Sequence, residues 1–328
     1  MQLVVIGVLI VGIAFLIFYL ARNMLRSRTA DVSATQNRSK ILHAVKTAKA
    51  AVERDPEDAQ AHYRLGKAFL ADKREEQAFR EYRTASRLGI TGKDIPEIEF
   101  RETLASLYGK FKEVEEALKE YVMLIKMRPE NADYYFQVGK LFAQRNRPDR
   151  VEQYLRKAVS LNPKSENYRF ELGSHYYLSK KIKEASTEFE AVLKLNPANG
   201  EALLYMGKIL KDAKDYVGSI SYLEQAARDQ GYKLRALVEI GVCYMALKTL
   251  DKAAVELERA VGSITKDADG DSLYARYFLA MCYEKQQEFQ KAVDQWEKIY
   301  AHKKSFRDVG EKLTQYIEYR QEHSEAKR

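Results

Sequence analysis

Histidines are the first residues to test for chemistry, because imidazole is common among metal ligands and general bases. No two of them have the spacing of a metal-binding motif, and the sequence has no Gly-rich phosphate loop and no nucleophile arrangement of Ser, Cys and His. The carboxylates fall at positions expected to be exposed on helices. We therefore predict no catalytic residue, no metal site and no cofactor, and hence no enzyme. The histidines are His43, His62, His175, His302 and His323.

The run DADGD, residues 267–271, is similar in composition to a calcium-binding loop. Its glycine stands at the fourth position of such a loop rather than the sixth, and the twelfth position is Phe278, where a bidentate Glu is needed. We interpret the run as a solvated loop in which Asp271 or Ser272 caps the following helix.

A periodic pattern covers most of the chain. A Gly or Ala stands three residues before an aromatic or large apolar residue, and this arrangement recurs at steps of 39, 34, 34, 34, 34 and 39 residues. A period of 34 is typical of a helix–turn–helix repeat. The small residues are Gly66, Ala105, Gly139, Gly173, Gly207, Gly241 and Ala280.

Further apolar residues and prolines keep the same register in neighbouring units. They are Leu172, Gly173, Tyr176, Ala185, Phe189 and Pro197 in one unit, and Val138, Gly139, Phe142, Val151, Leu155 and Pro163 in the unit before it. With this skeleton, residues 59–303 resemble the tetratricopeptide repeat family. The resemblance implies an all-α fold, a right-handed superhelix (α-solenoid) of about seven repeats that start near residues 59, 98, 132, 166, 200, 234 and 273.

Each repeat position has a physical reason. Small residues such as Gly173 and Gly207 are expected where the two helices of a pair approach closely, because a side chain larger than methyl would force them apart. Large residues such as Phe189 are expected to fill the space between one pair and the next. Prolines such as Pro163 end the second helix, because the residue before a proline disfavours the α conformation.

Two cysteines, Cys243 and Cys282, occupy the same first-helix position in adjacent repeats. A disulfide requires α-carbons within about 7 Å, whereas equivalent points on packed neighbouring helices are usually about 8 to 10 Å apart. We therefore expect two small buried hydrophobic residues rather than a disulfide. Two cysteines do not indicate a redox compartment.

The array is expected to have a helix at each end. Residues 40–58 are predicted to form an N-terminal capping helix, with Ala44, Ala48 and Ala51 in register with the repeats. Residues 304–328 are predicted to form a C-terminal capping helix and tail.

The C-terminal helix has its own start signal and apolar stripe. A capping box formed by Ser305 and Asp308 is predicted to open it, and apolar residues follow at helical spacing as far as Ile317. The two steps of 39 residues mark insertions of five, within residues 89–97 and 267–271.

The N-terminal segment is long and apolar. Residues 3–20 contain no charged side chain, and with the residues at their ends they are close to the roughly 20 needed to cross a bilayer. One alternative is a signal peptide cleaved after Ala34, although its basic residues would normally precede a shorter apolar run. The other is an apolar helix buried in the soluble domain. We predict a transmembrane anchor over residues 1–26 and a basic, polar tether over residues 27–39.

Basic residues are concentrated directly after the apolar run. Residues 21–55 hold eight Lys and Arg against three Asp and Glu, in a chain of net charge +8. A nucleic-acid-binding protein is expected to concentrate charge on its folded surface, so we predict no nucleic-acid partner. Arg22, Arg26 and Arg28 can contact anionic lipid, or they only set the orientation of the anchor.

The same basic residues indicate on which side of the membrane the repeats lie. Lys and Arg flanking a spanning helix favour the cytoplasmic side, so we predict a single-pass protein of a bacterial inner membrane with cytoplasmic repeats. A long C-terminal domain can be exported despite such charges, and a periplasmic repeat domain is therefore the alternative.

The resemblance also implies a binding surface. In this family the first helix of each repeat lines a concave groove, chiefly through the second, fifth, ninth and twelfth repeat positions. Aromatics and lysines there suit an extended or helical peptide with an apolar anchor and some acidic character, and packing between helices is the alternative role of the aromatics. The groove residues are Tyr63, Lys67, Leu70, Phe136, Lys140, Phe170, Tyr177, Lys208, Lys211, Met245, Tyr274 and Tyr277.

These features favour a membrane-anchored scaffold that binds partner proteins. Chaperone docking is not expected, because Tyr63 and Lys67 stand where chaperone-binding relatives have the lysine and asparagine that hold a terminal carboxylate. One alternative is a structural component of a cell-envelope machine, similar in architecture to repeat proteins of the spirochaete periplasmic flagellar collar. Another is an organelle import receptor. The oligomeric state is left open.

Overall fold

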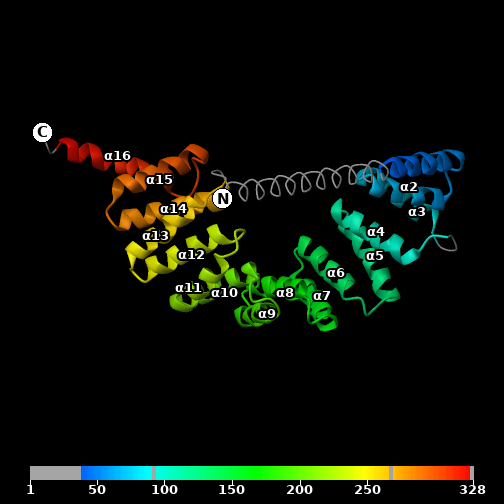
Figure 1. Ribbon diagram of the computed structural model, residues 1–328, viewed down its shortest axis with the longest axis horizontal. Helices are drawn as coiled ribbons and strands as arrows, with labels where there is room; N and C mark the ends of the chain where they lie inside the picture. Colours follow the sequence, from blue (N-terminus) through cyan, green and yellow to red (C-terminus); the bar gives the residue numbers. More distant parts are fainter. Residues whose placement is uncertain (1–37, 91–93, 266–268, 326–328) are drawn as a thin grey trace, which may run out of the picture. The chain divides into compact units, whose positions relative to one another are not determined.

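The computed structural model describes residues 38–90, 94–265 and 269–325, and within these residues every regular element is a helix (Figure 1). An all-α architecture of helix pairs is therefore confirmed for the described residues. The chain divides into two compact units, Met1–Arg145 (unit 1) and Asn146–Arg328 (unit 2).

Unit 1 begins, among described residues, with a helix over residues 38–54. Ala48 of this helix is buried against Leu65 and Phe69, with Val45 and Val52 packed beside it. The predicted register is wrong at Ala44, which is exposed, because the two valines bury more apolar surface than alanine. The further helices of unit 1 are α2 (Ala59–Ala71), α3 (Glu75–Leu88), α4 (Glu97–Lys110), α5 (Val114–Met127) and α6 (Ala132–Gln144).

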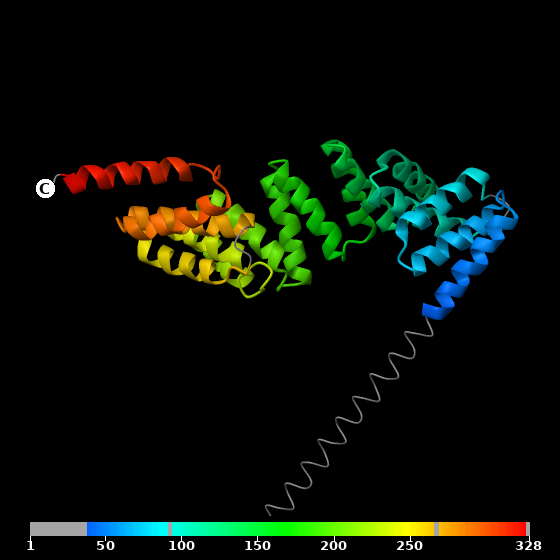
Figure 2. The same cartoon turned by 90° about the horizontal axis from the view of Figure 1, so that it is seen from above.

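Unit 2 continues the alternation of helices that stack side by side (Figure 1). Its last helix, α16, runs beside α15 and is red in Figure 2. The helices are α7 (Pro148–Leu161), α8 (Glu166–Leu178), α9 (Ile182–Leu195), α10 (Gly200–Asp212), α11 (Tyr216–Ala226), α12 (Lys233–Ala246), α13 (Leu250–Gly262), α14 (Gly270–Lys285), α15 (Phe289–His302) and α16 (Val309–Glu325).

The two helices of a pair are joined by a three-residue turn whose middle residue is left-handed. At Lys180, for example, φ is 61°, its N–H bonds the Tyr177 carbonyl at 3.1 Å, and the Lys181 N–H bonds the Tyr176 carbonyl at 2.9 Å. This is the Schellman motif, in which glycine usually takes the left-handed position. The equivalent residues in the other turns are Lys73, Lys112, Asn146, Lys214, Lys248 and Gln287.

Glycines lie where the helices of a pair approach most closely. A Cβ added at Gly207 would lie 2.5 Å from the Leu223 side chain, and one at Gly241 would lie 2.4 Å from Leu257. Even a methyl group is therefore too large at these two positions, a tighter limit than the sequence predicted. Phe189 lies within its own pair, 2.9 Å from a Cβ added at Gly173, and also stacks on Tyr205 of the next pair at 5.0 Å.

Second helices end before prolines. Helices α5, α7 and α9 end two residues before Pro129, Pro163 and Pro197, and the residue between has φ between −135° and −139° and ψ between 75° and 92°. It has thus left the α conformation, which a following proline disfavours.

Several first helices, though not α4 and α12, begin at a capping side chain. Ser165 caps α8 by accepting a hydrogen bond from the Tyr168 N–H, and Asn199 caps α10 in the same way. At α14 the cap is Asp269, which accepts from the Ser272 N–H at 2.7 Å. The prediction that Asp271 or Ser272 is the cap is wrong, because the helix begins two or three residues earlier.

The predicted start of α16 is also wrong. The helix begins at Val309, so Ser305 is not its N-cap. The carboxylate of Asp308 instead accepts a hydrogen bond from the Tyr277 hydroxyl at 2.8 Å. Tyr277 lies in the preceding pair, a distant contact that no local pattern signals.

Both cysteines are free and fully buried, as predicted. Burial raises the pKa of the Cys282 thiol to about 11.

No helix in the described ranges is both long enough and apolar enough to cross a membrane. Residues 1–37, which include the predicted anchor and most of the tether, lie outside the described residues.

Candidate functional site

A cavity of about 450 Å³ lies within unit 2, among α10, α12, α14 and the turn that precedes α16. Its walls combine four cations, two carboxylates and four apolar or aromatic side chains. The lining residues are Lys208, Lys211, Arg235, Val238, Glu239, Val242, Asp271, Tyr274, Phe278 and Arg307.

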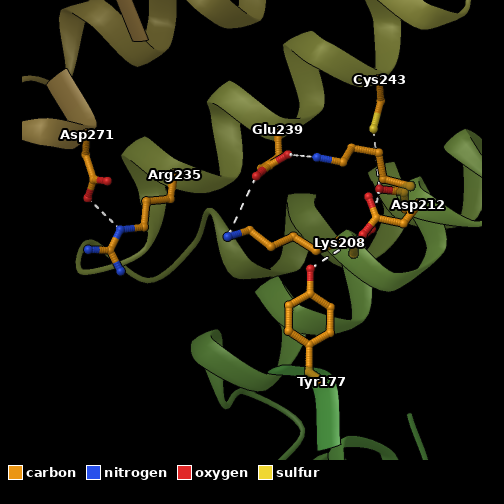
Figure 3. Close-up of polar contacts among 10 residues, drawn as sticks. Tyr177, Lys208, Asp212, Arg235, Glu239, Cys243 and Asp271 are labelled. Atoms are coloured by element: carbon orange, nitrogen blue, oxygen red, sulfur yellow. Dashed lines mark hydrogen bonds and ion pairs between the residues drawn. The ribbon is translucent and has the colours of Figure 1, made fainter. Parts of the chain in front are cut away.

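Glu239 lies between two lysines of the neighbouring first helix (Figure 3). Lys211 donates to Glu239 at 2.6 Å, whereas Lys208 Nζ is 3.8 Å from the same carboxylate, beyond hydrogen-bonding distance. Burial lowers the pKa of Lys211, but the charge of Glu239 and its hydrogen bond raise it more, so that the net pKa is raised. Lys211 therefore stays charged, and Lys208 is the less tightly held of the two.

Arg235 reaches the start of the next first helix. Its Nε donates to Asp271 at 2.5 Å, and both side chains are about half exposed at the mouth of the cavity (Figure 3). The hydrogen bond to Asp271 raises the pKa of Arg235. The carboxylate that the sequence suggested as a helix cap thus holds a cavity arginine.

Arg307 lies over a platform of aromatic rings. Its guanidinium carbon is 4.8 Å from the ring centres of both Tyr274 and Tyr277 and 5.8 Å from that of Phe278. Phe306 packs against the two tyrosine rings from the same turn. A guanidinium over aromatic rings is held by cation–π attraction. It has five N–H donors, and those that do not reach the two tyrosine hydroxyls can bind a ligand.

The floor between these charges is apolar. Val238 is buried, while Val242 and Phe278 are half-buried and expose part of their side chains to the cavity. The arrangement suits a ligand that has both an apolar and an anionic group.

Metal binding finds no support in the part of the chain that the structure describes, where no group of three or more His, Cys, Asp or Glu could hold an ion. His62, one of the five histidines, instead contacts the Glu81 carboxylate at 2.6 Å through Nδ1 and the Pro56 carbonyl at 3.0 Å through Nε2.

A family model for the tetratricopeptide repeat matches residues 37–91, 103–166 and 170–233. Together these segments make up more than half of the chain. The chain belongs to the tetratricopeptide repeat family.

Two curated proteins match this tetratricopeptide repeat protein over part of their length. Anaphase-promoting complex subunit 3 of Schizosaccharomyces pombe is 24% identical over 178 residues, covering 54% of this chain and 27% of that protein. Type IV pilus assembly protein PilF of Pseudomonas aeruginosa is 26% identical over 138 residues, covering 42% of this chain and 55% of that protein. The chain thus spans about a quarter to about half of the length of these relatives.

Among solved structures, a tetratricopeptide repeat protein from Parabacteroides merdae superposes with a TM-score of 0.56. The sequence identity is 13%, and the match covers 78% of this chain and 97% of the other. At this identity the likeness shows the fold alone.

The structure brings three of the predicted groove residues, Lys208, Lys211 and Tyr274, together around the cavity. Tyr277 is buried beside them, with its ring under Arg307. Met245 is half-buried and packs on the core of the last two repeats.

Two further predicted residues form an aromatic group next to this site. Tyr177 donates from its hydroxyl to Asp212 at 3.5 Å, and its ring lies 5.2 Å from Tyr205 (Figure 3). Phe170 lies 5.7 Å from Tyr205 and 5.6 Å from Phe189. Phe170 thus has a packing role between repeats, and only part of its ring is exposed.

Of the predicted residues of unit 1, the two aromatics are buried, the leucine is half-buried and the two lysines are exposed. Tyr63 is buried against Tyr82 and Phe100, with Lys67 over its ring at 5.4 Å. Leu70 is half-buried on the core formed with the helix over residues 38–54. In α6, Phe136 is only 3% exposed and Lys140 lies over its ring at 5.5 Å.

The sequence interpretation missed several residues of the cavity. Arg235, Val238 and Val242 stand at the second, fifth and ninth positions of their repeat, so the positional rule that selected Lys208 also marks them. Emphasis on lysines and aromatics left them out. Glu239 and Phe278 stand at the sixth position, and Asp271 and Arg307 lie outside the repeat positions, so nothing in the pattern marks them.

Proposed function

We propose that this protein is a membrane-anchored scaffold that captures a peptide or helical segment of a partner protein in the groove of its tetratricopeptide repeats. The observation that carries the proposal is the cavity of about 450 Å³, which groove positions of three successive repeats leave open. Apolar anchors that fill such pockets usually dominate the free energy of binding. Val238, Val242 and Phe278 provide the apolar surface for one.

A binding role without catalysis fits the chemistry of the cavity. Three of its cations lie within 4 Å of a carboxylate, and the fourth lies on aromatic rings. Such groups recognise a ligand by charge and shape. We therefore propose protein partners, no cofactor and no nucleic acid.

Membrane anchoring through residues 3–20 is part of the proposal and rests on their apolar sequence. Arg22, Arg26 and Arg28 follow directly and favour a cytoplasmic location for the repeats at a bacterial inner membrane. The second candidate is a part of a cell-envelope machine with periplasmic repeats. It is favoured by the similarity to a protein whose name assigns it to type IV pilus assembly.

Filling the cavity tests the proposal. In the tagged full chain purified from membranes, Val242→Trp should fill the floor of the cavity and abolish recovery of partner proteins. Val255→Trp is the matched control, because Val255 lies on α13 with 53% of its surface exposed and does not line the cavity. Equal recovery of the same partners by both variants would count against a groove scaffold.

Fusions after Arg328 distinguish the two locations. Cytoplasmic repeats predict a fluorescent green fluorescent protein fusion and an inactive alkaline phosphatase fusion. The reverse pattern would favour the envelope machine. Release of the intact chain by alkaline carbonate would contradict an anchor in either case.

A further inference from the structure

We propose that the cavity selects partner segments carrying an acidic side chain, and that Arg307 binds its carboxylate. The inference rests on the proposed function, since it names the chemistry of the segment that the groove captures. It concerns a residue outside the repeats, contributed by the turn between α15 and α16.

The charges of the cavity are unbalanced. Lys208, Lys211, Arg235 and Arg307 face only two carboxylates, Glu239 and Asp271. Both carboxylates already accept a close hydrogen bond, from Lys211 at 2.6 Å and from Arg235 at 2.5 Å. Two positive charges are left to be balanced, those of Lys208 and Arg307.

Arg307 has no carboxylate within ion-pair distance among the residues that the structure describes. The nearest acid along the chain, Asp308, accepts the Tyr277 hydroxyl at 2.8 Å. Burial lowers the pKa of Arg307, while hydrogen bonding to Tyr274 and Tyr277 raises it more. Its guanidinium is therefore a fixed cation with hydrogen-bonding capacity to spare.

The backbone of Arg307 is strained in a way that the repeat does not require. Its φ is 46°, in the left-handed region, but unlike the seven turn residues it does not join the two helices of a pair. A left-handed conformation is unfavourable for a residue other than glycine. The stacking of the side chain on the rings of α14 accompanies this strain, which places the guanidinium at the edge of the cavity.

The apolar floor restricts the ligand further. Val242 and Phe278 lie in the same cavity as Lys208 and Arg307. To contact both the apolar floor and the cations, a partner segment must carry an apolar side chain and a carboxylate on one face. Residues three or four apart on a helix meet this condition. A guanidinium edge binds a planar carboxylate with two parallel hydrogen bonds, which makes an acid the best anionic match.

The experiment is a thermodynamic cycle on full-length protein in detergent. Short random peptides displayed on phage are selected on the wild type, and one enriched peptide is synthesised with its Glu or Asp and with Gln or Asn in that place. We expect the amide to bind the wild type about tenfold more weakly, which corresponds to about 1.4 kcal/mol. On Arg307→Gln the two peptides should differ by less than about twofold.

Arg228→Gln is the matched control, because it removes one arginine charge at an exposed position outside the cavity. It should keep the tenfold difference. If Arg307→Gln lowers the melting temperature measured by circular dichroism, Lys208→Gln is used in place of that variant. On Lys208→Gln we expect the acidic peptide and its amide to differ in affinity by about threefold.

The outcomes separate this inference from the proposed function. Suppose that Val242→Trp excludes the enriched peptides, but that these peptides lack acidic residues or keep the tenfold difference on Arg307→Gln. Such a result would overturn the inference and leave the proposed scaffold function intact. If Val242→Trp excludes none of the enriched peptides, both proposals fail.

Discussion

The predicted groove positions have different surfaces in the two units, and we compare a closed section within unit 1 with an open section within unit 2. In unit 1 the fifth position of the first repeat is Tyr63, which packs on Tyr82 at 5.8 Å and on Phe100 at 5.8 Å and is 5% exposed. In unit 2 the fifth and ninth positions of the sixth repeat are Val238 and Val242, which line a cavity of about 450 Å³. The same family positions are filled in one section and open in the other.

The difference shows that the size of the side chain at a repeat position, and not the position alone, decides whether a cavity remains there. Both sections have a lysine of one first helix paired with a glutamate of the next, Lys67 with Glu99 at 2.7 Å and Lys211 with Glu239 at 2.6 Å. Charge pairing therefore does not distinguish the sections. Valine in place of tyrosine leaves the space.

The largest effect is expected in the closed section. Tyr82→Ala removes a ring that is 1% exposed and contacts Tyr63 and Phe100, so it should destabilise unit 1 by about 3–5 kcal/mol. Urea unfolding followed by circular dichroism measures this cost.

The control in the open section is Tyr274→Ala, where the side chain is 40% exposed. It should cost less than about 1.5 kcal/mol, because the lost ring is partly in water already. Equal costs for the two substitutions would remove the distinction between a closed and an open section.

A smaller loss of stability is expected when a methyl group is added at a glycine where two helices are in contact. Gly66→Ala meets the Tyr82 ring at 2.7 Å and Gly207→Ala meets Leu223 at 2.5 Å, so each should cost about 1–3 kcal/mol. Only Gly207→Ala should also weaken peptide binding, because α10 carries Lys208 and Lys211.

The matched control is Gly262→Ala, where an added Cβ meets nothing within 4 Å. It should stabilise the protein slightly, since alanine is the better helix residue. Loss of peptide binding with Gly66→Ala would show that the closed section also takes part in binding.

The smallest effect concerns the exposed pair of the closed section. Lys67 and Glu99 are about half exposed, so a double-mutant cycle with Lys67→Gln and Glu99→Gln should give a coupling of about 0.5 kcal/mol at pH 7. The hydrogen bond from Lys67 lowers the pKa of Glu99 in the folded protein. The stability that ionised Glu99 contributes is therefore fully present above the pKa that Glu99 has in the unfolded chain. It is lost as the pH falls through the lower pKa of Glu99 in the folded protein.

Coupling energies between Lys67 and Glu99 measured at pH 7 and at pH 3 test whether the coupling weakens on acidification, as we expect. A coupling that grows on acidification would contradict the assigned ion pair.

The fold class could be predicted because its causes are local and periodic. Gly66, Gly207 and Gly241 mark close helix contacts that recur in the sequence, and each meets a large side chain of the following helix. The same period reappears in the left-handed turn residues from Lys73 to Gln287.

The cavity could be predicted only in part. Lys208, Lys211 and Tyr274 follow from repeat positions, but Arg307 comes from a turn that lies outside the repeat and reaches rings of α14. Aspartate is a common helix-capping residue. Only the hydrogen bond from Arg235 to Asp271 reveals the role of this carboxylate. Contacts between distant residues carry no signal in a single sequence.

The central claim is that partner segments bind in the open section of the groove. A photoreactive benzoylphenylalanine is placed at Tyr274, an exposed aromatic position that lines the cavity, or at Lys67 of the full chain, and each is irradiated with the selected peptide. We predict a cross-link from position 274 and none from position 67. A cross-link from position 67 without one from position 274 would contradict the account.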